Sequence, residues 1–202
     1  LFEVLNDRGL QVSQADLLKN LCIKKGETFA SQKEMYDKWQ DVIDDNLKED
    51  NKIPFLRTSY NSKHDFIRKN ELYAKYKSKI GEKDFEETCL YLDEELAVDV
   101  ENYNLCLLLG GKQLSSRIQN SISLLYHTYT TQWRSIVLAL LRSPLAGLEK
   151  EILVAEILDE VFEIVFTMVA NETRFNEIET QFPEFAVKIN KTNNLKSVLT
   201  EI

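Results

Sequence analysis

Hydrophobic residues recur at intervals of three and four along almost the whole chain, which is the spacing of one face of an α-helix. Such stripes include Met35, Trp39, Ile43 and Leu47, then Phe85, Cys89, Leu92 and Leu96, then Leu114, Ile118, Ile122 and Leu125. No alternation of apolar and polar residues continues for more than a few positions. Six glycines and three prolines are also too few for the many turns of an all-β protein. The pattern predicts an all-α fold, an irregular multi-helix bundle.

The longest apolar segment runs from Leu148 to Val169 and is hydrophobic over a wide arc of a predicted helix. A helix that is apolar on most sides is usually buried. We therefore expect this segment to form a central helix, among the most buried of the fold. The 202 residues are enough for one sizeable core, so we expect a single helical domain over residues 1–202.

The N-terminal stretch predicts a helix, a tight polar turn and a second helix. The first five residues have the apolar spacing of a helix face, and the polar run Asn6–Gly9 follows, where a helix would stop and turn. Ser13 is placed to cap a second helix, with Asp16 as the acidic residue three positions further on.

This stretch resembles a segment of the GmrSD-like family, which comprises bacterial modification-dependent (type IV) restriction endonucleases and related phage-defence proteins. The matching residues are Phe2, Leu5, Asn6, Arg8, Gly9, Ser13, Asp16, Leu17, Leu18, Lys19 and Asn20. A second, later segment is similar to a helical segment of the same family through Phe55, Leu56, Arg57, Tyr60, Ser62, Lys63, Glu71, Leu72 and Tyr73. Tyr60 stands where Trp is common in the family.

The resemblance implies an internal helical fragment of a larger enzyme. The family's nucleotide-related D-G-Q-Q-R motif and its HNH nuclease motif are both absent from this sequence. Residues 1–25 resemble the end of the N-terminal DGQQR domain, and residues 26–202 would be the middle region that joins it to the C-terminal nuclease. The parent would be an HNH-type DNA endonuclease that uses a nucleoside triphosphate and a divalent metal. The fragment would bind no cofactor and would be inactive alone. Its partners would be the N- and C-terminal domains of the parent chain and modified DNA. It would not bind a membrane.

Asn6, Arg8 and Gly9 are the candidate residues near a nucleotide or phosphate. A guanidinium can grip a phosphate at two points, and a glycine allows close approach of the backbone. The family keeps this turn close to its nucleotide-related site, which favours a functional role. The alternative is a helix cap and a connecting turn that need no ligand. Asp16 is interpreted as an acid at a helix N-terminus rather than as a catalytic base.

The formal charge of −8 argues against a general nucleic-acid binder, but the charge is unevenly spread. Between Lys48 and Lys83 there are ten basic and five acidic residues, with tyrosines interleaved. Basic and aromatic residues together favour contact with a phosphate backbone and exposed bases. The candidate DNA contacts are Arg57, Lys63, Arg68 and Lys69. The alternative is a solvated helix face whose aromatic residues, such as the i, i+3 pair Tyr73 and Tyr76, lie in the core.

No catalytic residue and no metal ligand is predicted in this chain. Adjacent acids such as Asp44 and Asp45 point about 100° apart on a helix, so they do not converge on one ion. The acidic positions Glu156, Asp159, Glu160 and Glu163 share one side of a helix but lack the Glu-x-x-His partner of carboxylate metal sites. A solvated acidic face is the simpler interpretation. The two histidines, His64 and His127, have no ligand at metal-site spacing.

Three cysteines, Cys22, Cys89 and Cys106, show no paired spacing and predict reduced core residues of a cytoplasmic protein. No apolar run reaches the eighteen or so residues that a membrane span requires. The predicted function is therefore the helical middle region of a GmrSD-like protein, in contact with DNA. The alternative is a helical protein–protein interaction module with no nucleic-acid role, which would require an exposed apolar patch.

Overall fold

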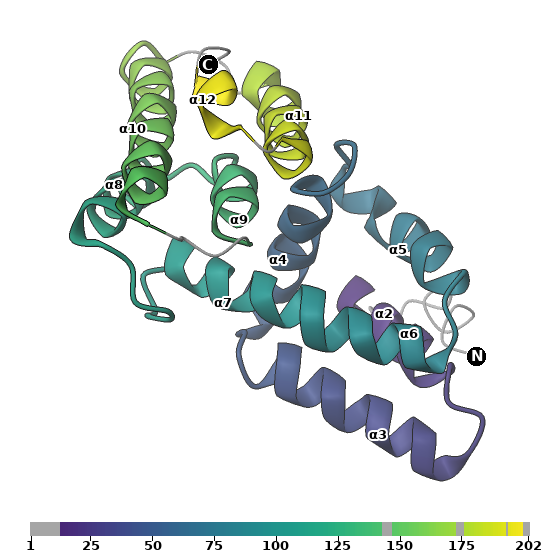
Figure 1. Cartoon of the computed structure of the whole chain (residues 1–202). Helices are drawn as coiled ribbons and strands as arrows, with labels where there is room; N and C mark the ends of the chain where they lie inside the picture. Colours follow the sequence, from purple (N-terminus) through teal and green to yellow (C-terminus); the bar gives the residue numbers. More distant parts are fainter. Residues whose placement is uncertain (1–12, 143–146, 173–175, 193, 200–202) are drawn as a thin grey trace. The chain divides into compact units, whose positions relative to one another are not determined.

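The computed structural model describes residues 13–142, 147–172, 176–192 and 194–199 (Figure 1). Helices and their connections make up these residues, and none of them lies in a strand. The predicted all-α class and the irregular multi-helix bundle are confirmed. Among the described helices, none combines the length and the apolar content that are needed to cross a lipid bilayer.

The chain divides into two compact units, residues 1–57 with 67–100 and residues 58–66 with 101–202. The first unit contains α2 (Gln14–Ile23), α3 (Phe29–Trp39), η1 (Gln40–Asp44), η2 (Lys69–Glu71), α5 (Leu72–Gly81), α6 (Phe85–Leu90) and η3 (Tyr91–Leu96). The second contains α8 (Ser116–Tyr126), α9 (Arg134–Arg142), α10 (Leu148–Ala170), α11 (Asn176–Lys191) and α12 (Leu195–Leu199). Two of the three boundaries fall within α4 (Glu49–Asn61) and α7 (Ala97–Cys106), and the third lies between residues 66 and 67. The single-domain prediction stays a prediction.

Helix α2 begins where the sequence predicts, because Ser13 and Asp16 form a reciprocal capping box. The Ser13 hydroxyl oxygen accepts from the Asp16 N–H at 3.1 Å, and the Asp16 carboxylate accepts from the Ser13 N–H at 3.3 Å. Asp16 therefore serves the helix start, as predicted. Leu17 and Leu18 point into the core of the first unit.

The stripe of Met35, Trp39, Ile43 and Leu47 is fully enclosed, although the α-helix ends at Trp39. The chain continues as the π-helical segment η1, in which the Asp45 N–H donates to the Gln40 carbonyl, five residues back, at 2.9 Å. A strict interval of four residues drifts around an α-helix of 3.6 residues per turn. The wider winding of η1 corrects that drift and keeps the stripe on one face.

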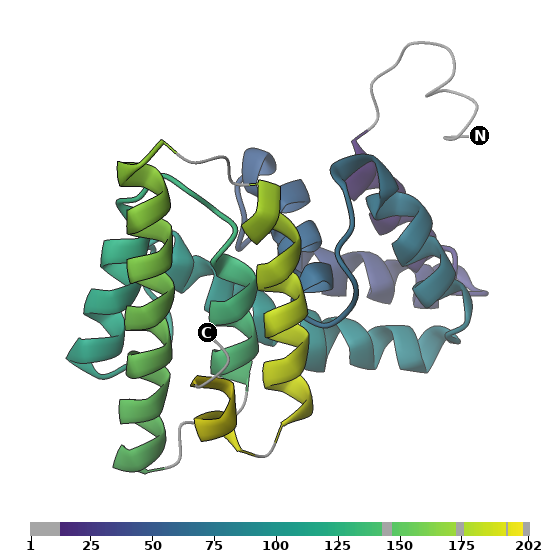
Figure 2. The same ribbon diagram turned by 90° about the horizontal axis from the view of Figure 1, so that it is seen from above.

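In the second unit, α8, α9, α10 and α11 lie alongside one another, as both views show (Figures 1 and 2). Helix α9 is the most completely enclosed, since every residue from 135 to 141 is buried. The prediction of a helix over Leu148–Val169 is confirmed, but its expected central position is wrong. Helix α10 buries one face and leaves Leu148, Ile152, Phe166 and Val169 exposed.

Candidate nucleic-acid interface

Parts of the two segments that carry the family resemblance, residues 13–20 of the first and 69–73 of the second, lie side by side in the first unit. The Gln14 side chain joins them, because its amide nitrogen donates to the Lys69 carbonyl at 2.9 Å and its amide oxygen accepts from the Tyr73 N–H at 3.1 Å. At the other end of the pair, the Lys25 ammonium donates to the carbonyls of Gly81 and Lys83. Helices α2 and α5 therefore run parallel and are held together at both ends.

Lys19, a matching residue of the first segment, belongs to a partly buried ion network. Its ammonium lies 2.6 Å from the Asp44 carboxylate and 4.0 Å from the centre of the Tyr36 ring. The other oxygen of Asp44 lies 2.6 Å from the Lys52 ammonium, which also contacts Glu49 at 2.8 Å. The network ties α2 to the start of α4.

The pKa of the Asp44 carboxyl reflects two opposing causes. Burial raises it, but hydrogen bonds and charge attraction from Lys19 and Lys52 outweigh burial, so that the pKa is lowered from its usual value. For Lys52, burial lowers the pKa, but the contacts with Asp44 and Glu49 leave it raised. Asp44 and Lys52 are therefore both charged around neutral pH, which is the property of a structural clamp.

The predicted site residues fall in different places. Asn6, Arg8 and Gly9 lie outside the described residues. Arg57 is half-buried, and its Nε donates to the Ile67 carbonyl at 2.9 Å, so it holds the chain that leads into α5. Lys63 belongs to the second unit. Arg68 and Lys69 are exposed and adjacent at the start of α5.

Helix α5 and the residues next to it carry a concentrated positive charge. Residues 68–83 include six basic side chains, Arg68, Lys69, Lys75, Lys77, Lys79 and Lys83, and only two acidic ones, Glu71 and Glu82. Glu71 accepts from the Arg68 N–H at 2.7 Å, which is a cap at the helix start. Lys79 lies 3.9 Å from Glu95 and, with Lys83, faces the Tyr91 ring. Lys75 and Lys77 are exposed, although neither is among the DNA contacts predicted from the sequence.

The aromatic residues of this segment divide between core and surface. Tyr76 is buried, and its hydroxyl donates to the Leu56 carbonyl at 2.9 Å. This position agrees with the alternative interpretation, in which the aromatic residues of the segment lie in the core. Tyr73 is partly exposed, and the Lys77 ammonium lies 5.7 Å from the centre of its ring. Tyr76 thus belongs to the core, and Tyr73 remains at the surface beside a cation.

Acidic and thiol groups elsewhere serve structure. Asp159 accepts from the Ser121 hydroxyl at 2.6 Å and from Arg117 at 3.1 Å, which joins α10 to α8. Within the described part of the chain, no three His, Cys, Asp or Glu side chains gather as a metal site would need. Burial raises the pKa of the Cys22 and Cys106 thiols to about 12, so both are unreactive at neutral pH.

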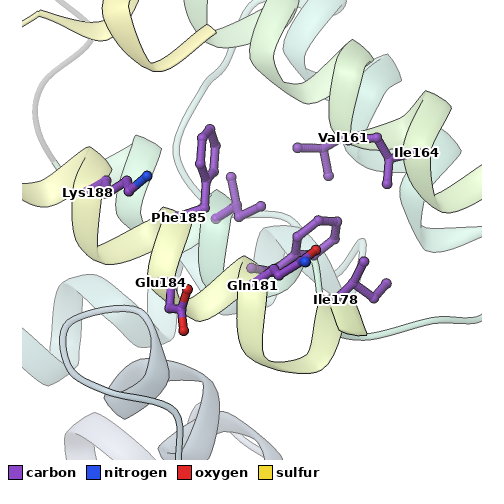
Figure 3. A pocket seen from close by; sticks show the side chains of 9 residues that line it. Val161, Ile164, Ile178, Gln181, Glu184, Phe185 and Lys188 are labelled. Carbon is purple, nitrogen blue, oxygen red and sulfur yellow. The ribbon is translucent and has the colours of Figure 1, made fainter. Parts of the chain in front are cut away.

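A pocket of about 310 Å³ lies between α9, α10 and α11 of the second unit (Figure 3). Its lining is mostly apolar and includes Ile136, Val161, Ile164, Ile178, Phe182 and Phe185, with Gln181, Glu184 and Lys188 as polar members. Figure 3 shows the Lys188 ammonium turned toward the Phe185 ring and the Glu184 carboxylate turned away from it. An apolar pocket of this size suits a small molecule or an inserted side chain.

Comparison with known proteins gives no match to a family model, to a curated protein or to a solved structure. The fold and the charge distribution define an all-α protein with a basic helix surface.

Proposed function

We propose that this chain is the helical middle region of a cytoplasmic, GmrSD-like modification-dependent restriction or phage-defence protein. In the parent it links a nucleotide-related N-terminal domain to a C-terminal nuclease and contacts DNA. The observation that supports the proposal is the bridge made by Gln14. This one side chain forms hydrogen bonds with the backbone of Lys69 and of Tyr73, which lie 55 and 59 positions further along the sequence. Helix α2 and the start of α5, which each carry part of the resemblance, are therefore joined.

This arrangement suits a linking region. Helix α2 begins shortly after Asn6, Arg8 and Gly9 in the sequence, so we expect a change at those residues to reach the basic start of α5 through Gln14. Among the matching residues of the first segment, Ser13 and Asp16 cap α2, Lys19 pairs with Asp44, and Leu17 and Leu18 are buried. The nucleoside triphosphate, the divalent metal and the catalytic groups then belong to the other domains of the parent.

The test uses the full-length parent with a nucleoside triphosphate, Mg²⁺, and modified or plain DNA. We expect cleavage of modified DNA, and we expect Gln14→Ala to reduce it because α2 and α5 lose their bridge. Gln119→Ala is the matched control, since Gln119 makes a comparable 2.8 Å bond to the Leu114 carbonyl in the second unit. The proposal would be refuted if the parent cleaved neither modified nor plain DNA. It would also be refuted if Gln14→Ala and Gln119→Ala reduced cleavage equally.

The second candidate function is a helical protein–protein interaction module with no nucleic-acid role. It is favoured by the exposed apolar residues of α10, where Leu148 is 73% and Phe166 55% exposed. Phe166→Ser should then abolish the cellular activity of the parent, while substitutions on α5 should leave it unchanged. If substitutions on α5 abolished the activity and Phe166→Ser left it unchanged, the DNA-linked function would be favoured.

A further inference from the structure

We infer that the outer surface of α5 is a docking surface for the sugar–phosphate backbone of nucleic acid. The contacts come from Arg68, Lys69, Lys75 and Lys77 and do not depend on base sequence or base modification. This surface deepens the proposed function and rests on it for the identity of the polymer as DNA.

The charge of this surface opposes that of the whole chain. Six basic and two acidic residues lie between positions 68 and 83, in a chain whose formal charge is −8. Of the two acids, Glu71 is engaged as a cap on the Arg68 N–H. A local excess of positive charge on a negative protein attracts a polyanion to the place where that charge is concentrated.

The shape of α5 lets a polyanion approach closely. Leu72, Tyr76 and Ile80 form its buried stripe. Lys75 and Lys77 are two positions apart, so they project about 200° apart around the helix, on either side of its outer arc. The residues of that arc are small and exposed, namely Ala74, Ser78 and Gly81. No bulky side chain therefore stands between the two lysines.

Helix α5 is also held in place before any ligand arrives. Gln14 fixes its start, and Lys25 binds the carbonyls of Gly81 and Lys83 at its end. The C-terminal carbonyls of a helix carry partial negative charge that would repel a phosphate. The Lys25 ammonium offsets part of that charge at the Gly81 carbonyl. A preorganised surface also loses less conformational entropy on binding.

The residue types indicate contact with phosphates rather than bases. Lysine acts as a point charge, whereas base edges are commonly recognised by bidentate Arg, Asn or Gln side chains. A protein partner is disfavoured because protein interfaces rely on buried apolar anchors, and the outer arc of α5 has none. Recognition of the DNA modification therefore belongs to another part of the parent.

The test measures fluorescence anisotropy of a labelled DNA duplex, modified or plain, with the purified chain at 50, 100 and 200 mM KCl. Four phosphate contacts predict a slope of about −3.6 for log K against log salt. The slope should be the same for both duplexes. Lys75→Ala combined with Lys77→Ala should reduce its magnitude by about 1.8. The control is Lys33→Ala combined with Lys48→Ala, which removes the same charge from exposed positions outside α5. It should change the slope little.

The inference would be overturned if the chain did not bind DNA at 50 mM KCl. It would also be overturned if the control variant reduced the salt slope equally, or if the chain preferred modified DNA tenfold. Binding of polyglutamate in place of DNA would assign the surface to an acidic protein instead and would also overturn it. If the chain fails to bind while the parent still cleaves modified DNA, the inference fails and the proposed function stands. If the chain binds but the parent cleaves no DNA, the proposed function fails.

Discussion

Asp44→Asn should destabilise the protein far more than an ordinary surface substitution. The Asp44 carboxylate lies 2.6 Å from two ammonium groups, and the three side chains are only 12–16% exposed. A hydrogen bond to a charged group contributes about 1.5–3 kcal/mol, and breaking a buried pair leaves a charge without compensation. The substituted amide keeps one neutral acceptor, so we expect a loss of roughly 2–4 kcal/mol. The melting temperature should fall by roughly 4–16 °C.

The pH dependence of this loss follows from the lowered pKa of Asp44. A carboxyl whose pKa is lower in the folded state contributes its full stability above its ordinary pKa of 3.8. That contribution disappears as the pH falls through the folded value. The difference between wild type and Asp44→Asn should therefore be complete at pH 7 and should shrink as the pH is lowered below 3.8. The raised pKa of Lys52 adds stability that is present below its ordinary value of 10.5 and is lost as the pH rises through the folded value.

Urea unfolding followed by circular dichroism at pH 7 and at acidic pH measures both effects. The matched control is Asp37→Asn, because Asp37 pairs with Lys33 at 3.2 Å while both side chains are more than half exposed. This pair should contribute no more than about 0.5 kcal/mol. Equal effects of the two substitutions, or a difference that does not change with pH, would refute the assignment of Asp44 as a charged clamp.

The purified chain should neither cleave DNA nor hydrolyse nucleoside triphosphates with Mg²⁺ present; activity lost on mutating a residue of this chain would contradict this. Leu138→Ala should cost about 2–5 kcal/mol in urea unfolding because Leu138 is fully buried in α9. The half-exposed Leu124 provides a control whose truncation should cost much less. In the intact parent, Arg8→Lys should reduce activity roughly tenfold with little change in melting temperature; joint loss of activity and stability would make Arg8 a structural residue.

Local chemistry in the sequence determined the fold class and the start of α2. A capping box involves groups only three residues apart, and a helical stripe needs only the regular recurrence of apolar side chains. Ser13, Asp16 and the stripe from Met35 to Leu47 could therefore be interpreted without any tertiary contact. The positive charge between Lys48 and Lys83 was visible in the same way.

Only the tertiary structure decided which residues share a surface and which are enclosed. The partners of Gln14 and Lys25 are more than fifty positions away, and no local pattern specifies them. Composition favoured α10 as the central helix, yet α9 is more enclosed, because burial depends on neighbours on every side and not on apolar content alone. Arg57 is held by the Ile67 carbonyl, whereas Lys75 remains on the exposed arc of α5. A charged residue becomes a clamp or a binding group according to the atoms that packing brings within reach of it.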